Sequence, residues 1–164
     1  MKKNLTIIAL AAATAVSLSA CGTLGNTYDK RETKTFSNGA AGKADGALPS
    51  WVPDGATDIK MMFRTTGAER IMVLKNGSPL PTTCTAVPAG QKPVSGEDPD
   101  NAYPAKDFSN GPATLSADWW PSGTEQKASS VCGRWWVTID GDKTYAYAPE
   151  TTQIVQEVQK EQKK

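Results

Sequence analysis

The feature that most constrains the fold is a pair of alternating segments near the C-terminal end of the chain, residues 134–140 and 143–148. Apolar and polar side chains alternate along a β-strand because successive side chains point to opposite faces. The short connection Asp140-Gly141-Asp142 is typical of a tight turn between antiparallel strands. This stretch therefore predicts a β-hairpin.

A second hairpin is predicted from Asp58 to Arg64 and from Arg70 to Lys75, where apolar residues again alternate around a short turn. Leu80 to Val87 is expected to return as a short third strand. Ala113 to Trp120 is expected to form a short helix that ends before a proline. The predicted fold class is α+β: a small, mostly antiparallel sheet with one or two short helices and one disulfide.

The N-terminal region has the three parts of a secretory signal. Lys2 and Lys3 precede an apolar, alanine-rich stretch over residues 5–18, which is shorter than a membrane-spanning helix requires. Leu18-Ser19-Ala20-Cys21 then matches the lipobox at every position, and in this the chain resembles bacterial lipoproteins. The alternative is an ordinary signal peptide with a chance cysteine beside the cleavage site.

The resemblance implies that the sulfur of Cys21 carries a diacylglyceryl group and that cleavage makes Cys21 the first residue. Stable anchoring needs two acyl chains, each buried methylene contributing about 0.8 kcal/mol. The implied location is the extracytoplasmic face of a cell membrane, with membrane lipid as a partner through acylated Cys21. Gly22 follows the cysteine, where an aspartate would retain a lipoprotein in the inner membrane of a two-membrane cell.

The other two cysteines, Cys84 and Cys132, form an even pair in a chain expected to reach an oxidising compartment. Such a pair predicts a disulfide. The bond would close a loop of 48 positions, and in the chain-entropy account such a bond stabilises the folded state by about 4 kcal/mol. The alternative is that both cysteines are free, buried thiols. A metal site is not expected, because two cysteines without a histidine provide too few ligands.

Composition divides the chain into four parts. Residues 1–20 are the signal peptide, and residues 21–47, which contain few large apolar residues, are predicted to be a lipidated, disordered tether with a reach of roughly 28 Å. Residues 48–150 are the folded α+β domain, with a long surface loop over 88–112. Residues 151–164 are predicted to form a tail or a short helix.

Charge and composition exclude several functions. The chain contains no histidine, the commonest general base and metal ligand. Basic and acidic residues nearly balance, which argues against a nucleic-acid partner. The acidic residues Glu97, Asp98, Asp100 and Asp107 lack the spacing and the glycine of a calcium loop. No cofactor is expected, and no spacing of residues indicates a catalytic site.

Aromatic residues provide the one candidate ligand site. Trp135, Val137 and Ile139 are the more apolar set and are expected to take the core. A two-residue turn would place Trp136, Tyr145 and Tyr147 together on the other face of the hairpin. This face is either an exposed binding surface for sugars or peptides of the cell wall, or a second small core covered by the 88–112 loop or the tail.

A further resemblance is carried by Leu48-Pro-Ser-Trp-Val-Pro-Asp-Gly-Ala-Thr-Asp-Ile59, by Arg64-Thr-Thr-Gly67 and by a paired cysteine. Together they are similar to a group of small actinobacterial lipoproteins, which implies a one-membrane cell. The expected function is a non-enzymatic binding or shielding module of the cell envelope, with an envelope protein or a cell-wall component as partner. The alternative is a small cell-wall hydrolase.

Overall fold

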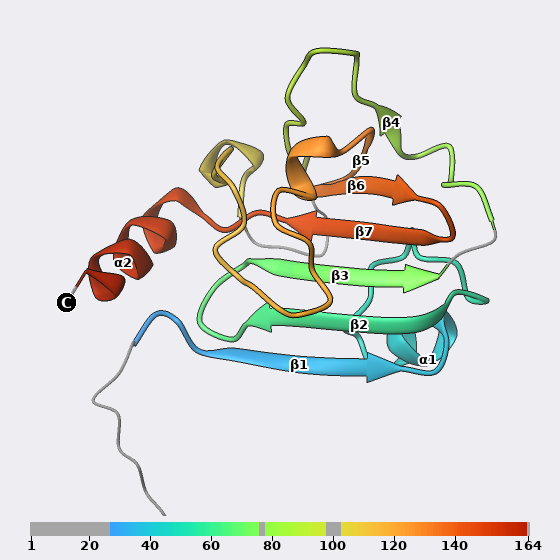
Figure 1. The fold of residues 1–164 in the computed structure, drawn as a ribbon, viewed down its shortest axis with the longest axis horizontal. Coiled ribbons are helices and arrows are strands. Elements are labelled where there is room, and N and C mark those ends of the chain that lie inside the picture. The colour runs from blue at the N-terminus through green and yellow to red at the C-terminus, as the bar shows by residue number, and fades with distance from the viewer. Residues whose placement is uncertain (1–26, 76–77, 98–102, 164) are drawn as a thin grey trace, which may run out of the picture.

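The computed structural model describes residues 27–75, 78–97 and 103–163 and consists of one antiparallel sheet with short helices around it (Figure 1). The spatial order of the strands is β1-β2-β3-β7-β6-β5-β4. In chain order the strands are β1 Arg31–Phe36, β2 Thr57–Arg64, β3 Arg70–Lys75, β4 Thr85–Ala86, β5 Ser130–Cys132, β6 Trp135–Asp140 and β7 Lys143–Ala148. The predicted α+β class with a mostly antiparallel sheet is confirmed.

Both predicted hairpins are present, as β2–β3 and β6–β7. Asp140 pairs with Lys143, so the second turn contains two residues, and Gly141 has a φ of 60°. This left-handed conformation is the one that glycine adopts without steric cost, which explains the glycine in the turn.

The disordered-tether prediction is wrong for residues 27–47. This stretch includes the edge strand β1 and the helix α1, Gly39–Ala44, before which the Asn38 side chain accepts a hydrogen bond of 2.9 Å from the Ala41 N–H group. Composition misses this region because an edge strand is held by backbone hydrogen bonds to β2 and requires few large apolar side chains. Residues 21–26 lie outside the described part of the chain.

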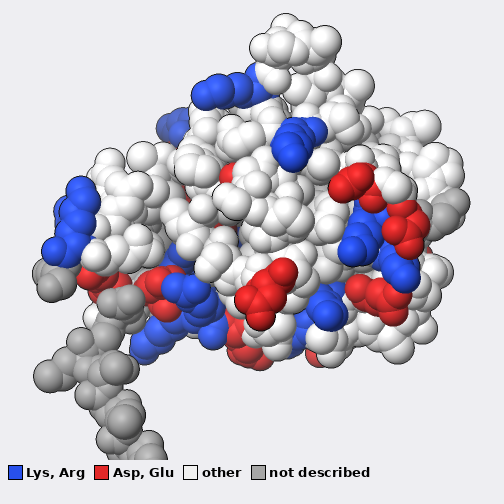
Figure 2. All heavy atoms as spheres, in the orientation of Figure 1, with Lys and Arg blue, Asp and Glu red and all other residues white. Residues whose placement is uncertain are grey.

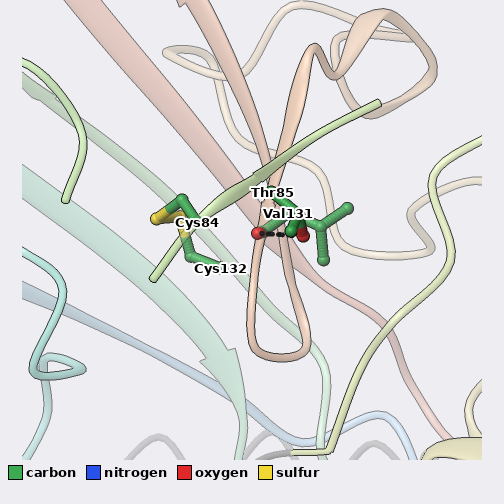
Figure 3. The surroundings of a disulfide bond; sticks show 4 residues. All are labelled: Cys84, Thr85, Val131 and Cys132. Atoms are coloured by element: carbon green, nitrogen blue, oxygen red, sulfur yellow. Dashed lines mark hydrogen bonds between the residues drawn. A yellow bond between two sulfur atoms is a disulfide. The ribbon is translucent and has the colours of Figure 1, made fainter. Parts of the chain in front are cut away.

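The third predicted strand is reduced to β4, which pairs with β5 at the far edge of the sheet. Its neighbour β5 contains Cys132, and the predicted disulfide to Cys84 is confirmed across 48 positions of sequence (Figure 3). Beside it, the Thr85 hydroxyl donates a 3.4 Å hydrogen bond to the Val131 carbonyl oxygen. The disulfide thus fastens the two-residue strand to the sheet.

The helix predicted for Ala113 to Trp120 is wrong, because this segment is irregular. The short 3-10 turns η1 Ala105–Asp107 and η2 Glu125–Lys127 flank it. The predicted C-terminal helix is present as α2, Thr152–Gln162. Of the helices in the described ranges, none is long and apolar enough to cross a membrane.

Apolar side chains cover both faces of the sheet. One face packs against the segment before β2, with a core of Leu48, Trp51, Val52, Ala56, Ile59, Met61, Met72, Leu74, Cys132, Trp135, Val137, Ala146 and Ala148. Trp135 and Val137 thus take the core as predicted, whereas Ile139 at the strand end is 54% exposed. The opposite face has its own core of Ile71, Val73, Leu115, Trp120, Ala128, Trp136, Tyr145 and Tyr147.

Candidate functional site

The aromatic residues predicted to bind a ligand do lie on one face, but they are buried. Trp136 pairs with Tyr147 across β6 and β7, and the two rings make an edge contact at 5.2 Å. The exposed fractions are 1% for Trp136, 1% for Tyr147 and 6% for Tyr145. The prediction of an exposed aromatic binding surface is therefore wrong. The alternative of a covered second core is confirmed, although the main cover is neither the 88–112 loop nor the tail that was expected.

The cover is mainly the irregular segment 113–128, which crosses in front of β7, β3 and β2 (Figure 1). Trp120 contacts Tyr145 edge-on at 5.8 Å, and the Thr138 hydroxyl donates a 2.8 Å hydrogen bond to the Thr124 carbonyl oxygen. The long loop contributes Ser95, whose hydroxyl oxygen accepts a 3.0 Å hydrogen bond from Trp136 Nε1. These contacts hold the covering segment on the sheet.

The covering segment leaves an open groove of 710 Å³ at the end of the sheet where β1 and β3 finish and where β2 and β7 begin. Trp119, half-buried beside fully packed Trp120, forms one wall together with Tyr145. The complete lining is Thr35, Phe36, Ser37, Asp58, Ile59, Lys60, Val73, Leu74, Lys75, Asp118, Trp119, Pro121, Lys143 and Tyr145.

A β-bulge shapes the charged side of this groove. The register of β2 against β3 shifts between Thr57 and Lys60, and Asp58 within the bulge has a φ of 50°, a conformation that aspartate tolerates better than most residues. The Asp58 carboxylate lies 3.1 Å from Lys75 Nζ. Its hydrogen bond raises the pKa of Lys75, which therefore remains a cation rather than becoming a base.

Three further charged groups of the groove are unpaired within the described part of the chain: Lys60, Lys143 and Asp118. Figure 2 shows basic and acidic side chains interspersed on the face of the molecule that it displays. In the lining itself three lysines face two aspartates. The groove combines an aromatic wall with a small excess of positive charge.

The opposite end of the sheet carries a buried ionic cluster, defined by Asp29, Arg64, Glu69 and Glu150. Arg64 Nη2 lies 3.0 Å from Glu69 Oε2, and Arg64 Nε lies 3.1 Å from Glu150 Oε2. Arg64 Nη1 also donates to Asp29 Oδ1. Burial opposes the charge of the guanidinium, but the hydrogen bonds with Glu69 and Asp29 prevail and raise the pKa of Arg64.

The carboxylates of this cluster connect segments that are distant in the sequence. Glu69 Oε1 accepts a 2.6 Å hydrogen bond from the Thr114 N–H group, which fixes the start of the covering segment. Glu150 Oε1 accepts a 2.8 Å hydrogen bond from the Ala68 N–H group in the β2–β3 turn. A Cβ atom at Gly67 would lie 2.2 Å from Glu150 Oε2, so the turn requires glycine there.

The remaining candidates from the sequence form no site. Glu97 and Asp107 are exposed, whereas Cys21, Asp98 and Asp100 lie outside the described residues. No group of three histidine, cysteine or carboxylate residues in the described ranges is placed to hold a metal ion.

The alternation pattern did not predict the groove. Its lysines and aspartates occupy ordinary exposed strand and turn positions, which carry no sequence signal. The adjacent pair Trp119-Trp120 is the signal in the sequence, since an aromatic face suits the apolar C–H face of a sugar, although core packing is the more common role of such residues.

Comparisons of the chain with protein families, curated proteins and solved structures gave no match. The function is therefore inferred from the sequence motifs and from the geometry of the groove.

Proposed function

We propose that the protein is a membrane-anchored extracytoplasmic lipoprotein whose folded domain is a non-enzymatic binding module for a cell-wall component. The lipobox Leu18–Cys21 supports the anchor, and the groove at the β1–β3 end supports the binding module. The observation that carries the binding role is a partly buried tryptophan in the wall of the groove, Trp119, beside lysines without ionic partners among the described residues.

The chemistry of the groove favours an acidic saccharide. The apolar C–H face of a sugar ring packs on an aromatic ring such as that of Trp119. Lys60 and Lys143 are free to pair with a carboxylate on the same ligand, because no described residue neutralises them. Disaccharide-peptide fragments of peptidoglycan carry both features and are the proposed ligand class.

Acylation is tested by metabolic labelling with a clickable fatty acid. The wild-type protein should be labelled and should fractionate with membranes, because two acyl chains give stable anchoring. Cys21→Ser should remove the label and release the protein or leave the precursor uncleaved. An unlabelled wild-type protein would exclude the anchor.

Ligand binding is tested by titrating the folded domain with soluble disaccharide-peptide fragments of peptidoglycan and following tryptophan fluorescence. Trp119→Ala should weaken binding at least about tenfold, equivalent to 1.4 kcal/mol. Tyr103→Ala, which removes an exposed aromatic residue outside the groove, is the matched control and should bind as wild type.

The charge contribution is tested with a second pair of variants. Lys60→Ala should weaken binding of the acidic fragments but not of a neutral chito-oligosaccharide, whereas Lys127→Ala, an exposed lysine outside the groove, should change neither. Absence of binding by the wild-type protein would reject the module. Cleavage of the fragments would favour the hydrolase instead.

A further inference from the structure

The described chain begins close to the proposed anchor. Only residues 22–26 separate Cys21 from Thr27, the first residue that the structure describes. The six residue steps from Cys21 to Thr27 span at most about 22 Å even when fully extended. If Cys21 is held at a lipid surface, the part of the domain that holds Thr27 must therefore lie near that surface.

Thr27 and Tyr28 are hydrogen-bonded to α2 and to the β2–β3 turn. The Thr27 N–H group donates a 2.8 Å hydrogen bond to Glu161 Oε1 on α2, and the Tyr28 N–H group donates to the same carboxylate. The Tyr28 carbonyl oxygen accepts a 2.6 Å hydrogen bond from the Thr66 hydroxyl. The next residue, Asp29, belongs to the buried ionic cluster. The link to the anchor thus ends at a fixed point beside α2.

The surface around this fixed point suits a lipid headgroup region. Two of the four exposed large apolar or aromatic side chains of the described residues flank α2: Tyr28, which bonds to Glu161 in its last turn, and Tyr103, which borders a hollow with its first turn. Tyrosine favours the boundary between lipid and water because its ring is apolar and its hydroxyl is polar. Exposed basic residues of the same end are Lys30, Arg31, Lys106, Lys160 and Lys163.

The groove lies at the other end of the sheet. Strand β1 starts at Arg31, next to the fixed point, and ends at Phe36 in the lining of the groove (Figure 1). Five residue steps along a strand cover about 17 Å. The end that carries α2 and the end that carries the groove are therefore separated by the length of the strands.

From these contacts we propose that the end of the domain formed by residues 27–31 and α2 docks on a phospholipid surface, and that the groove faces away from the membrane. The proposal rests on the proposed acylation of Cys21. It adds an orientation of the domain on the membrane. The connection from Cys21 to the folded domain is a few residues long, rather than a tether up to residue 47, and the groove faces the cell wall.

The test uses the full acylated chain in phosphatidylcholine–phosphatidylglycerol vesicles that contain a headgroup nitroxide lipid. Two variants each carry one added cysteine for a fluorophore: Lys163→Cys beside α2 and Asp142→Cys in the turn at the groove end. The label at position 163 should be quenched several-fold more strongly than the label at position 142. Intact mass before labelling verifies that the Cys84–Cys132 disulfide is preserved.

A third variant carries a 20-residue Gly-Ser insertion between Asn26 and Thr27, which adds a root-mean-square reach of about 25 Å. It should reduce the difference between the two positions. Equal quenching at both positions without the insertion, with the protein in the vesicle fraction, would overturn the orientation alone. Recovery of the protein outside the vesicle fraction would overturn the anchor and the orientation together.

Discussion

The two ends of the sheet hold charged groups in opposite ways. At one end the side chains of Arg64, Glu69 and Glu150 are all 0% exposed; the guanidinium forms ion pairs with both carboxylates, and each carboxylate also accepts hydrogen bonds from backbone N–H groups. At the groove end the side chains of Lys75 and Asp58 are 46% and 67% exposed. Both ends contain ion pairs, but those of the ionic cluster are buried, whereas those of the groove end are accessible to a ligand.

This contrast indicates which charged residues can serve a binding function. A buried charge is costly unless partners satisfy it, so the ionic cluster must remain intact for the covering segment, the β2–β3 turn and the N-terminal residues to stay in place. An exposed ion pair contributes little to stability and can be exchanged for contacts with a ligand. The ionic cluster therefore has a structural role, and the contrast supports the proposal that the groove binds a ligand.

The largest effect is expected for Arg64→Met. The change leaves Asp29, Glu69 and Glu150 buried without their common cation and should lower the free energy of unfolding by about 3–5 kcal/mol. Urea denaturation followed by tryptophan fluorescence measures this loss. Arg31→Met is the control, because Arg31 is a 38% exposed partner of Asp29 and should cost less than about 1 kcal/mol. Equal stability of the two variants would remove the contrast between the ends.

The next effect distinguishes the covered aromatic core from the groove wall. Trp136→Ala should cost about 3–5 kcal/mol of unfolding free energy, because it leaves a cavity under the covering segment. Trp119→Ala, at a partly buried residue in the wall of the groove that packs against the edge of this core, should cost less, about 1–2 kcal/mol. Thermal denaturation of both variants separates the two roles. A loss at Trp119 as large as that at Trp136 would mean that the groove wall is part of the core.

The sequence predicts the parts of this fold that depend on local pattern. Alternation in residues 58–75 and 134–148 predicts the four central strands, and the cysteine count predicts the disulfide. The position of β4 at the far edge and the strand nature of β1 could not be predicted, because both depend on pairing with residues distant in the sequence.

The two ends of the sheet were beyond sequence reasoning for a related reason. Arg64 forms ion pairs with Asp29 and Glu150, which are distant in the sequence, and no local pattern around these residues indicates that they pair. The aromatic set of β6 and β7 was correctly placed on one face, but burial depends on the irregular segment 113–128, for which periodicity gives no information. Lipidation of Cys21 stays a prediction of the motif alone.

A smaller, pH-dependent effect is expected at Tyr147, which lies in the covered core near the ionic cluster. Burial raises the pKa of Tyr147 well above its ordinary value, and the charges of Glu69, Glu125 and Glu150 add to this. The unfolded chain therefore loses the tyrosine proton first, so stability is complete below about pH 10 and falls as the pH rises further. The slope contributed is at most about 1.4 kcal/mol per pH unit.

Tyr147→Phe removes this titration. Its free energy of unfolding, measured by urea denaturation between about pH 8 and pH 11, should fall less steeply than that of the wild type. Below about pH 9 the two proteins should differ by a constant amount. Parallel curves over the whole range would show that Tyr147 is not held neutral by its surroundings.

The smallest effect is expected for Lys75→Ala at the groove end. Lys75 pairs with Asp58 at 3.1 Å and with Asp142 at 3.7 Å, but all three side chains are exposed, so water and salt screen the attraction. The melting temperature should change by no more than about 3 °C, and the change should shrink further in 0.5 M salt.

The effect of Lys75→Ala should also depend on pH. Because Asp58 raises the pKa of Lys75, the lysine is charged below about pH 10. The charge-dependent difference from wild type should be constant up to that pH and vanish above the raised pKa. Differential scanning calorimetry at two salt concentrations measures both features. A loss comparable with that of Arg64→Met would show that the charges of the groove hold the fold together, and the groove would then no longer be the end of the molecule that is free to bind.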